Sequence, residues 1–307
     1  MTGLRDHLHD YVALRRSLGF ALHDADWLLP SFLAYLEDRG AAQVSTELAV
    51  AWACRPGVAA VTQRQRLVAV RGFAQYVAAF DVATEVPPAE LVPGRYVRIT
   101  PYLYSDEEIE ALMAAAAALA SPIRAATYST LIGLLSVSGL RLGEAIRLDD
   151  TDVDRRRQLL VVRDSKHERE RHVPLHPTTL DALGANTAQR DRRFPTSADA
   201  SLFVSTLGTR LNRRTVEQVW TRLVTAAGLG GRGARCRPRV HDIRHSFAVN
   251  TLIGWHRDGL DVDARMPLLS AALGHVNPAS TYWYLQAAPE LLDIVARRAR
   301  PAFEGLA

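Results

Sequence analysis

Residues 158–175 read QLLVVRDSKHERERHVPL, and this stretch decides the fold class because its pattern differs from that of the segments around it. Two runs rich in strand-forming residues are separated by a short polar stretch, which is typical of a β-hairpin. The surrounding segments place apolar residues at helical spacing instead. We therefore predict a mainly α chain with a mixed α+β part that holds a small antiparallel sheet.

The tip of this predicted hairpin carries Lys166, the only lysine in a chain with 37 lysine and arginine residues. An ammonium group whose pKa is lowered by neighbouring arginines can donate a proton to a leaving oxygen. Arginine cannot readily do so, because its pKa is too high. Lys166 is therefore a candidate general acid, and a solvated hairpin lysine is the simpler alternative.

The chain before the hairpin contains a helical part and a linker. The first eighty residues hold four segments with helical periodicity. Residues 81–101 contain four prolines and no helical period, which indicates an interdomain linker. We predict two domains, a four-helix domain at 1–85 and a mixed α+β domain at 105–307, joined by a linker at 86–104.

The second predicted domain begins with a helix signal, because Ser105 and Glu108 have the spacing of a capping box. Helices are expected at 106–120 and 125–137, and a further helix start follows Gly139. Beyond the hairpin, we expect helical segments at 213–229, at 240–255 and from residue 273 onward, with a break near Pro278.

Composition narrows the class of protein. Of 307 residues, 48% are hydrophobic and 23% charged, as in ordinary soluble globular proteins. The charged N-terminus lacks the apolar core of a signal peptide, and the most apolar window, residues 111–120, is too short to span a bilayer. Two distant cysteines, Cys54 and Cys236, suggest neither a disulfide framework nor a metal site, which fits a reducing cytoplasm.

Positive charge is concentrated in one segment. The net charge is only +4, but residues 210–244 contain nine arginines against Glu217 and Asp242. A local field of this kind favours a polyanion such as nucleic acid. A solvated face balanced by acidic residues elsewhere is the alternative.

The run HDIRH at 241–245 allows two interpretations. His241 and His245 are spaced as in the zinc-binding pattern H-E-x-x-H, but aspartate replaces the glutamate that would act as general base. Arg244 between them would repel a dication, and no third ligand is obvious unless His275 serves. In the alternative interpretation His245 is buried and hydrogen-bonded in the core. We expect no metal.

Arginine-centred phosphate chemistry fits these residues better. A guanidinium offers a planar, bidentate fork to a phosphate and stays charged. Arg141 and Glu144 share one helix face, although a surface ion pair is the commoner outcome of this spacing. Two arginines and two imidazoles could hold a phosphodiester and stabilise its transition state without a metal, with a tyrosine as nucleophile.

Four motifs, in order along the chain, resemble those of the tyrosine recombinases, also called the phage integrase superfamily. They are SGLRLGEAIRL at 138–148, SKHERERHVPL at 165–175, HDIRHSFA at 241–248 and LGHVNPASTYWYL at 273–285. The N-terminal helical part is similar to the four-helix, SAM-like core-binding domain of that family, so the resemblance covers most of the chain. The only departures are at the hairpin tip, where His167 and Glu168 replace a glycine and a small polar residue.

The resemblance implies which residues bind the scissile phosphate. Arg141 and Arg244 would clamp it, and Glu144 would support Arg141 from behind. His241 and His275 would hydrogen-bond it or move protons, with His241 the better candidate to accept the tyrosine proton.

The resemblance also implies which residues make and break bonds. Tyr284 would attack phosphorus and form a 3′-phosphotyrosyl link, while Lys166 would protonate the leaving 5′-oxygen. Tyr284 follows His275 by nine residues, as in the family, which selects it over Tyr282. Residues two apart on a helix point about 200° apart, so only one of the two tyrosines can face the phosphate.

Partners follow from the same resemblance. The family acts on double-stranded recombination sites as a homo-tetramer on synapsed DNA, in some cases with a second recombinase. No cofactor is expected, because the chain's only lysine lacks the preceding glycines of a nucleotide-binding loop. The arginines expected to contact DNA are Arg210, Arg213, Arg214, Arg232, Arg235, Arg237 and Arg239.

The leading interpretation is a site-specific recombinase, integrase or transposase, and TYWYL at 281–285 resembles members from mobile elements. A type IB topoisomerase would share the chemistry, but the helical N-terminal part argues against it. A non-catalytic DNA-binding protein would need neither Lys166 nor Tyr284, and a zinc hydrolase is the least favoured alternative. The amphipathic tail after residue 288 could pack on its own domain or dock on a neighbouring subunit.

Overall fold

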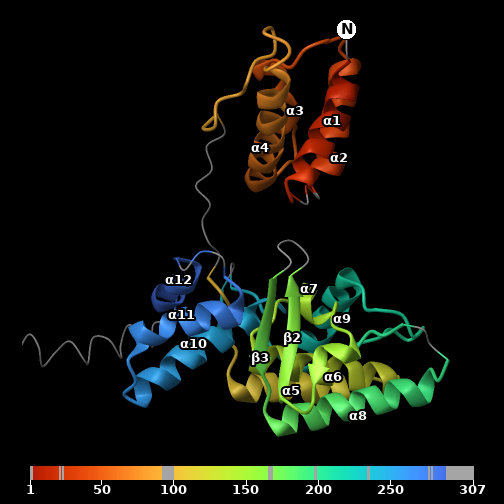
Figure 1. The fold of residues 1–307 in the computed structure, drawn as a ribbon, viewed down its shortest axis with the longest axis vertical. Coiled ribbons are helices and arrows are strands. Elements are labelled where there is room, and N and C mark those ends of the chain that lie inside the picture. The colour runs from red at the N-terminus through yellow and green to blue at the C-terminus, as the bar shows by residue number, and fades with distance from the viewer. Residues whose placement is uncertain are drawn as a thin grey trace, which may run out of the picture. The chain divides into compact units, whose positions relative to one another are not determined.

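The computed structural model of this protein describes residues 3–20, 22, 24–91, 100–164, 169–196, 199–233, 236–275, 277 and 279–287. The chain divides into two compact units, residues 1–98 and 99–307 (Figure 1). Most described residues are helical, and the strands form a small antiparallel sheet. The predicted fold class, a mainly α chain with a small antiparallel sheet, is confirmed.

Among its described residues, the first unit forms four helices: α1 (Leu4–Ser17), α2 (Ala25–Glu37), α3 (Thr46–Ala53) and α4 (Ala60–Val77). All four lie where the sequence predicts helices. α4 packs against the other three, and the core between them buries the rings of Phe32, Trp52 and Phe73. Burial of these large aromatic rings stabilises helices that are too short to persist alone.

The second unit begins with two helices that pack together, α5 (Asp106–Ala117) and α6 (Pro122–Ser138). The predicted capping box is present. The Ser105 hydroxyl accepts a hydrogen bond from the Glu108 N–H at 3.2 Å, and the Glu108 carboxylate accepts one from the Ser105 N–H at 3.0 Å. α8 (Pro177–Arg193), which the sequence did not predict, packs on α6, while α9 (Arg213–Ala226) packs on α5.

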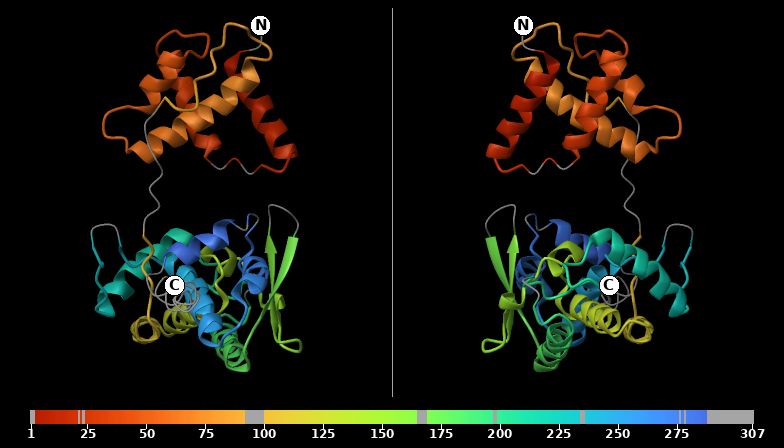
Figure 2. Two further views of the ribbon diagram at one scale, coloured as in Figure 1. Left: turned by 90° about the vertical axis from the view of Figure 1, so that its left-hand side faces the viewer. Right: turned by 90° about the vertical axis from the view of Figure 1, so that its right-hand side faces the viewer.

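The hairpin predicted from QLLVVRDSKHERERHVPL is present as two antiparallel strands, β2 (Leu159–Asp164) and β3 (Arg169–Pro174). A short strand that the sequence did not predict, β1 (Val153–Asp154), pairs with β2 and gives the order β1-β2-β3. Leu160 lies opposite Val173, and both side chains are buried. The sheet lies at one edge of the second unit (Figure 2) and packs this face against its core.

The helix predicted to follow Gly139 is only one turn long, α7 (Leu142–Ala145). Ile146 and Leu148 are both buried. The backbone leaves the helix through a turn, in which the Arg147 N–H donates to the Glu144 carbonyl at 3.1 Å and the Leu148 N–H donates to the Ala145 carbonyl at 3.3 Å. It then passes through a short 3₁₀ helix, η1 (Asp150–Asp152), into β1.

Three more helices are α10 (Asp242–Arg257), α11 (Val262–Leu273) and α12 (Ala279–Ala287). Their apolar side chains form a cluster of their own, separate from the core under the sheet. Figure 1 shows them gathered on one side of the second unit. α10 and α12 lie in predicted helical segments, but α11 was not predicted, because Pro267 interrupts its pattern.

Among the described residues, no helix is both long and apolar enough to cross a membrane. Cys54 and Cys236 are both free thiols, and they belong to different units.

Candidate active site

The first predicted pair, Arg141 and Glu144, lies where α6 ends and α7 begins. Gly139 ends α6 with φ of 61°, and a Cβ there would collide with the ring of Phe247. The Glu144 carboxylate accepts hydrogen bonds from the Arg141 guanidinium and from the Arg141 backbone N–H, both at 2.8 Å. Glu144 is buried, whereas 41% of the Arg141 side chain is exposed. Glu144 therefore holds the Arg141 guanidinium on one side, and part of the Arg141 side chain stays exposed.

Arg244 projects from the first turn of α10 into the interior and is only 2% exposed. Its guanidinium donates to the Gly139 carbonyl at 2.8 Å and to the Leu273 carbonyl at 2.6 Å. Burial, followed by the charge of Arg141, lowers the pKa of Arg244 to about 10. Arg244 therefore remains a cation at neutral pH, in a setting where its charge is poorly screened.

The end of α11 brings the two predicted arginines together. The Leu273 carbonyl accepts from Arg244, and the next carbonyl, that of Gly274, accepts from Arg141 at 3.2 Å. Carbonyls at a helix C-terminus lack partners within the helix and carry its negative end. Two guanidinium groups thus bind neighbouring carbonyls directly before His275.

His275 and the predicted nucleophile face each other. The His275 Nδ1 lies 2.7 Å from the Thr281 hydroxyl, and its ring stacks on that of Tyr284 with centroids 6.1 Å apart. Tyr284 is 2% exposed, whereas Tyr282, two residues before it, is 46% exposed. The two side chains leave α12 in different directions, so the nine-residue spacing selected the tyrosine that lies in this cluster.

The two histidines of HDIRH have different surroundings. His241 lies at the start of α10 with part of its surface exposed and part covered by protein, and its ring lies edge-on to that of His245 at 4.9 Å. The His245 ring packs 5.4 Å from Tyr284. Its Nδ1 is buried without a hydrogen-bond partner, so the expectation that the packed histidine would be hydrogen-bonded is wrong for that atom.

The aspartate of HDIRH, Asp242, does not have the surroundings that the zinc interpretation requires. Asp242 is fully buried, and the Arg239 guanidinium binds its carboxylate at 2.7 and 2.9 Å. A carboxylate held in this way is not available as a general base or a metal ligand. Within the described ranges, no group of three or more His, Cys, Asp or Glu side chains is arranged to hold a metal ion.

All three histidines of the cluster have lowered pKa values. Burial, followed by the charges of Arg244 and Arg141, lowers the pKa of His275 to about 4. Burial and then His241 lower that of His245 to about 3. For His241 the pKa also falls, through burial and Arg244. The three rings are therefore neutral at pH 7.

These shifts predict a loss of stability in acid. The folded pKa values of His245 and His275 lie below the unfolded value of about 6.5, so the unfolded chain binds more protons between about pH 6.5 and 4. The stabilising contribution of each neutral ring is fully present above about pH 6.5 and decreases as the pH falls, by about 1 to 2 kcal/mol for each ring at pH 5. Thermal unfolding of wild type and His245→Phe at pH 7.5, 6 and 5 measures the effect. The variant should lose less stability with acid, and an equal loss would contradict this prediction.

Arg171 was not among the predicted site residues, yet it lies at the centre of the network. It donates to both Glu144 carboxylate oxygens, at 3.1 and 2.7 Å. Burial alone would raise the pKa of Glu144, but Arg171, and after it Arg141, lower it to about 2. The register of the hairpin could have pointed to Arg171, because it shares the face of β3 that carries Val173.

Two predicted residues, Lys166 and Arg235, lie outside the described residues. Of the other predicted DNA-binding arginines, those with exposed side chains are Arg213, Arg214, Arg232, Arg237 and Arg239. Arg213 pairs with Glu217 at 2.9 Å, and Arg239 pairs with Asp242 at 2.7 Å. Arg210 instead bridges within the unit, donating to the Asp149 carboxylate at 2.6 Å and to the Ile146 carbonyl at 3.1 Å.

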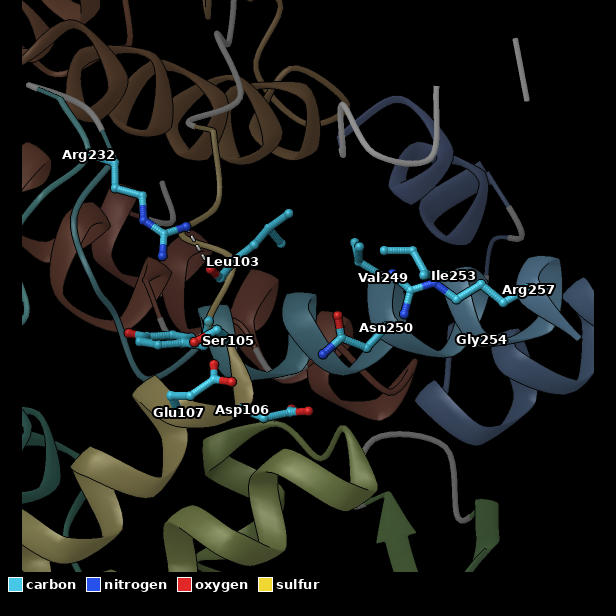
Figure 3. A pocket seen from close by; sticks show the side chains of 11 residues that line it. Leu103, Ser105, Asp106, Glu107, Arg232, Val249, Asn250, Ile253, Gly254 and Arg257 are labelled. Carbon is cyan, nitrogen blue, oxygen red and sulfur yellow. Dashed lines mark hydrogen bonds between the residues drawn. The ribbon is translucent and has the colours of Figure 1, made fainter. Parts of the chain in front are cut away.

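Arg232 also has partners within the unit. It donates to the Leu103 carbonyl at 2.9 Å and to the Glu108 carboxylate at 2.8 and 2.9 Å. Figure 3 shows it beside a pocket formed by residues 103–107 and α10, and none of the described catalytic candidates lines that pocket. DNA contacts by these arginines stay a prediction.

The known proteins that this chain resembles are integrases and recombinases. The model of the phage integrase family matches residues 103–290. The putative integrase/recombinase y4rB of Sinorhizobium fredii is 40% identical, covering 99% of each chain. Tyrosine recombinase XerD of Caulobacter vibrioides is 29% identical over 98% of this chain and 90% of its own.

A solved structure has a similar fold. The integrase of transposon Tn1549, in complex with transposon right end DNA, matches 96% of this chain and 98% of its own with a TM-score of 0.68. The two sequences are 16% identical, so this likeness concerns the fold alone.

Proposed function

Because the chain belongs to the phage integrase family of tyrosine recombinases and is a DNA breaking and rejoining enzyme, we propose that it cuts and rejoins recombination sites through a covalent 3′-phosphotyrosyl intermediate. One observation carries the proposal. Arg244 and Arg141 bind the carbonyls of Leu273 and Gly274, directly before His275, whose ring stacks on Tyr284. Two cations, an imidazole and a phenol thus meet at the end of α11.

In the proposed reaction, each bond that forms is matched by a bond that breaks. The Tyr284 hydroxyl oxygen forms a bond to phosphorus while the bond from phosphorus to the 5′-oxygen breaks. His241, neutral at pH 7, accepts the phenol proton, and Lys166 gives a proton to the leaving 5′-oxygen. Arg141 and Arg244 stabilise the extra negative charge on the phosphoryl oxygens. Attack by a free 5′-hydroxyl on the phosphotyrosine reverses every step.

This scheme uses only side chains and DNA. The phosphotyrosyl bond retains the energy of the phosphodiester, so rejoining requires no ATP. The two arginines supply the positive charge that a metal ion provides in many phosphoryl-transfer enzymes. We therefore propose a reaction without ATP or metal.

The proposal also covers the roles of the two units and the assembly of the protein on DNA. We take the first unit as a core-binding domain and the second as the catalytic domain, and we expect four protomers on two synapsed DNA sites. Relatives called integrase/recombinase and a transposon integrase of similar fold support action on mobile-element ends. Among the described residues, the exposed Arg213, Arg214 and Arg237 are candidates to bind phosphates.

The test is covalent capture of DNA. A binding selection on fragments of the source genome first identifies DNA that the protein holds specifically. That site is then prepared as a duplex with a nick close to the cleavage position, so that the short released strand diffuses away and traps the intermediate. We expect a protein–DNA adduct on a denaturing gel in the presence of EDTA and without ATP. Specific binding with no adduct would favour a non-catalytic DNA-binding protein, and an adduct that EDTA abolishes would contradict the metal-free scheme.

A further inference from the structure

Arg171 occupies an unusual position for an arginine. It lies opposite Val162 in the β2–β3 ladder, on the face that also holds Leu160 and Val173, and all three of these side chains are buried. Only 14% of the Arg171 side chain is exposed. Buried arginines are rare unless they are paired, so the contacts of this side chain should explain its place.

Its guanidinium joins three elements of the second unit. Two of its nitrogens donate to Glu144 of α7 at 3.1 and 2.7 Å, and its Nε donates to the Ala272 carbonyl of α11 at 3.0 Å. Gly274 has φ of 65°, and a Cβ there would lie 2.9 Å from an Arg171 nitrogen. The backbone directly before His275 therefore passes close against this guanidinium.

The contacts at the end of α11 form a series. The carbonyls of three consecutive residues, Ala272, Leu273 and Gly274, accept from Arg171, Arg244 and Arg141 in turn. Arg171 is therefore the third arginine of one arrangement in which the other two are the proposed phosphate clamp. It is the member that comes from the hairpin.

The charges of Glu144, Arg141 and Arg171 indicate what Arg171 contributes to the site. Glu144 is the buried anion shared by Arg141 and Arg171. With Arg141 as its only cationic partner, the carboxylate would offset the charge of that guanidinium and hold it back from a phosphate. With Arg171 present, the three groups carry a net single positive charge, which lies toward the open side where Arg141 is exposed.

From this geometry we propose that Arg171 is a positioning residue of the reaction: it neutralises Glu144 and fixes the Ala272–His275 backbone, so that Arg141 keeps its charge for the scissile phosphate. The inference rests on the proposed function. Arg171 touches no reacting atom in this scheme and acts through Glu144 and Arg141. Its removal should therefore slow strand cleavage more than it weakens DNA binding.

The first experiment compares two arginines of the same hairpin. Arg171→Gln is measured beside Arg163→Gln, since Arg163 lies on β2, 55% exposed, and pairs with Asp152 outside the site. Single-turnover cleavage of the nicked duplex should fall about 100-fold for Arg171→Gln, while its DNA dissociation constant changes less than about threefold. Arg171→Lys keeps the positive charge but loses the forked guanidinium, so it should cleave about tenfold faster than Arg171→Gln. Arg163→Gln should cleave like wild type.

A double-mutant cycle separates positioning from general support of the fold. If Arg171 acts by balancing Glu144, its removal should matter little once that carboxylate is gone. In a Glu144→Gln background, Arg171→Gln should lower the cleavage rate less than about fivefold. If Arg171→Gln lowers the cleavage rate by the same factor in the wild-type and the Glu144→Gln proteins, the inference is overturned. This holds even where the variants unfold at the same temperature as wild type.

A changed leaving group tests whether Arg171 acts through the hairpin tip instead. A 5′-bridging phosphorothiolate leaves without needing a proton, so it should rescue Lys166→Ala. It should not rescue Arg171→Gln, and rescue of that variant would overturn the inference. Failure of wild type to form an adduct would count against the proposed function, whereas cleavage by Arg171→Gln at the wild-type rate would count against this inference alone.

Discussion

Tyr284→Phe is expected to form no covalent adduct with DNA, a loss of at least about 1000-fold relative to wild type. Phenylalanine keeps the ring that packs against His245 and stacks on His275. It removes only the hydroxyl, which is the atom that the proposed reaction joins to phosphorus. Folding and DNA binding should therefore be retained, and the loss should lie entirely in chemistry.

Tyr282→Phe is the matched control, because it deletes the same atom two residues away. Tyr282 is 46% exposed and does not belong to the buried cluster that contains Tyr284. We expect adduct formation within about twofold of wild type for this variant. Adduct formation by Tyr284→Phe, or its loss in Tyr282→Phe alone, would show that the nucleophile is assigned wrongly.

Arg244→Lys is expected to lower single-turnover cleavage by about 100- to 1000-fold, although the positive charge is kept. The Arg244 guanidinium reaches two carbonyls that belong to residues 139 and 273, at 2.8 and 2.6 Å. An ammonium on a shorter, flexible stem cannot make both contacts and still present a fork to the phosphate. The buried carbonyl that loses its partner should also lower the free energy of unfolding by about 1 to 3 kcal/mol.

Arg155→Lys controls for the chemical change itself. Arg155 lies outside the site, with 45% of its side chain exposed, and pairs with Asp150 on the surface. The same substitution there should leave cleavage and thermal unfolding near wild type, since exposed ion pairs contribute little. Cleavage by Arg244→Lys within about fivefold of wild type would mean that charge alone, without the fork, satisfies this position.

The sequence predicted those features that depend on neighbours along the chain. The four helices of the first unit, the capping box at Ser105 and Glu108, and the β2–β3 hairpin follow from periodicity and local hydrogen bonds. The family follows as well, because four motifs stand in order at fitting distances. Tyr284 was separated from Tyr282 by counting residues, and their different exposure agrees with helical geometry.

Elements with a weak local pattern were missed. α11 contains Pro267, and β1 has two residues, too few to show a period. α7, expected only as a helix start after Gly139, is a single turn, and the chain then continues through a turn in which Ile146 and Leu148 are buried. In these places the packing of the whole unit outweighs local propensity.

The sequence by itself determined the helices, the hairpin, the family and the order of the candidate catalytic residues, because each depends on spacing along the chain. Only the tertiary structure decided how Glu144 is neutralised and why Arg171 is buried. The bonds from Arg171 to Glu144 and to Ala272 span 27 and 101 residues, and that from Arg141 to Gly274 spans 133. No local pattern encodes such pairs, since they form only when the hairpin, α7 and the end of α11 pack together.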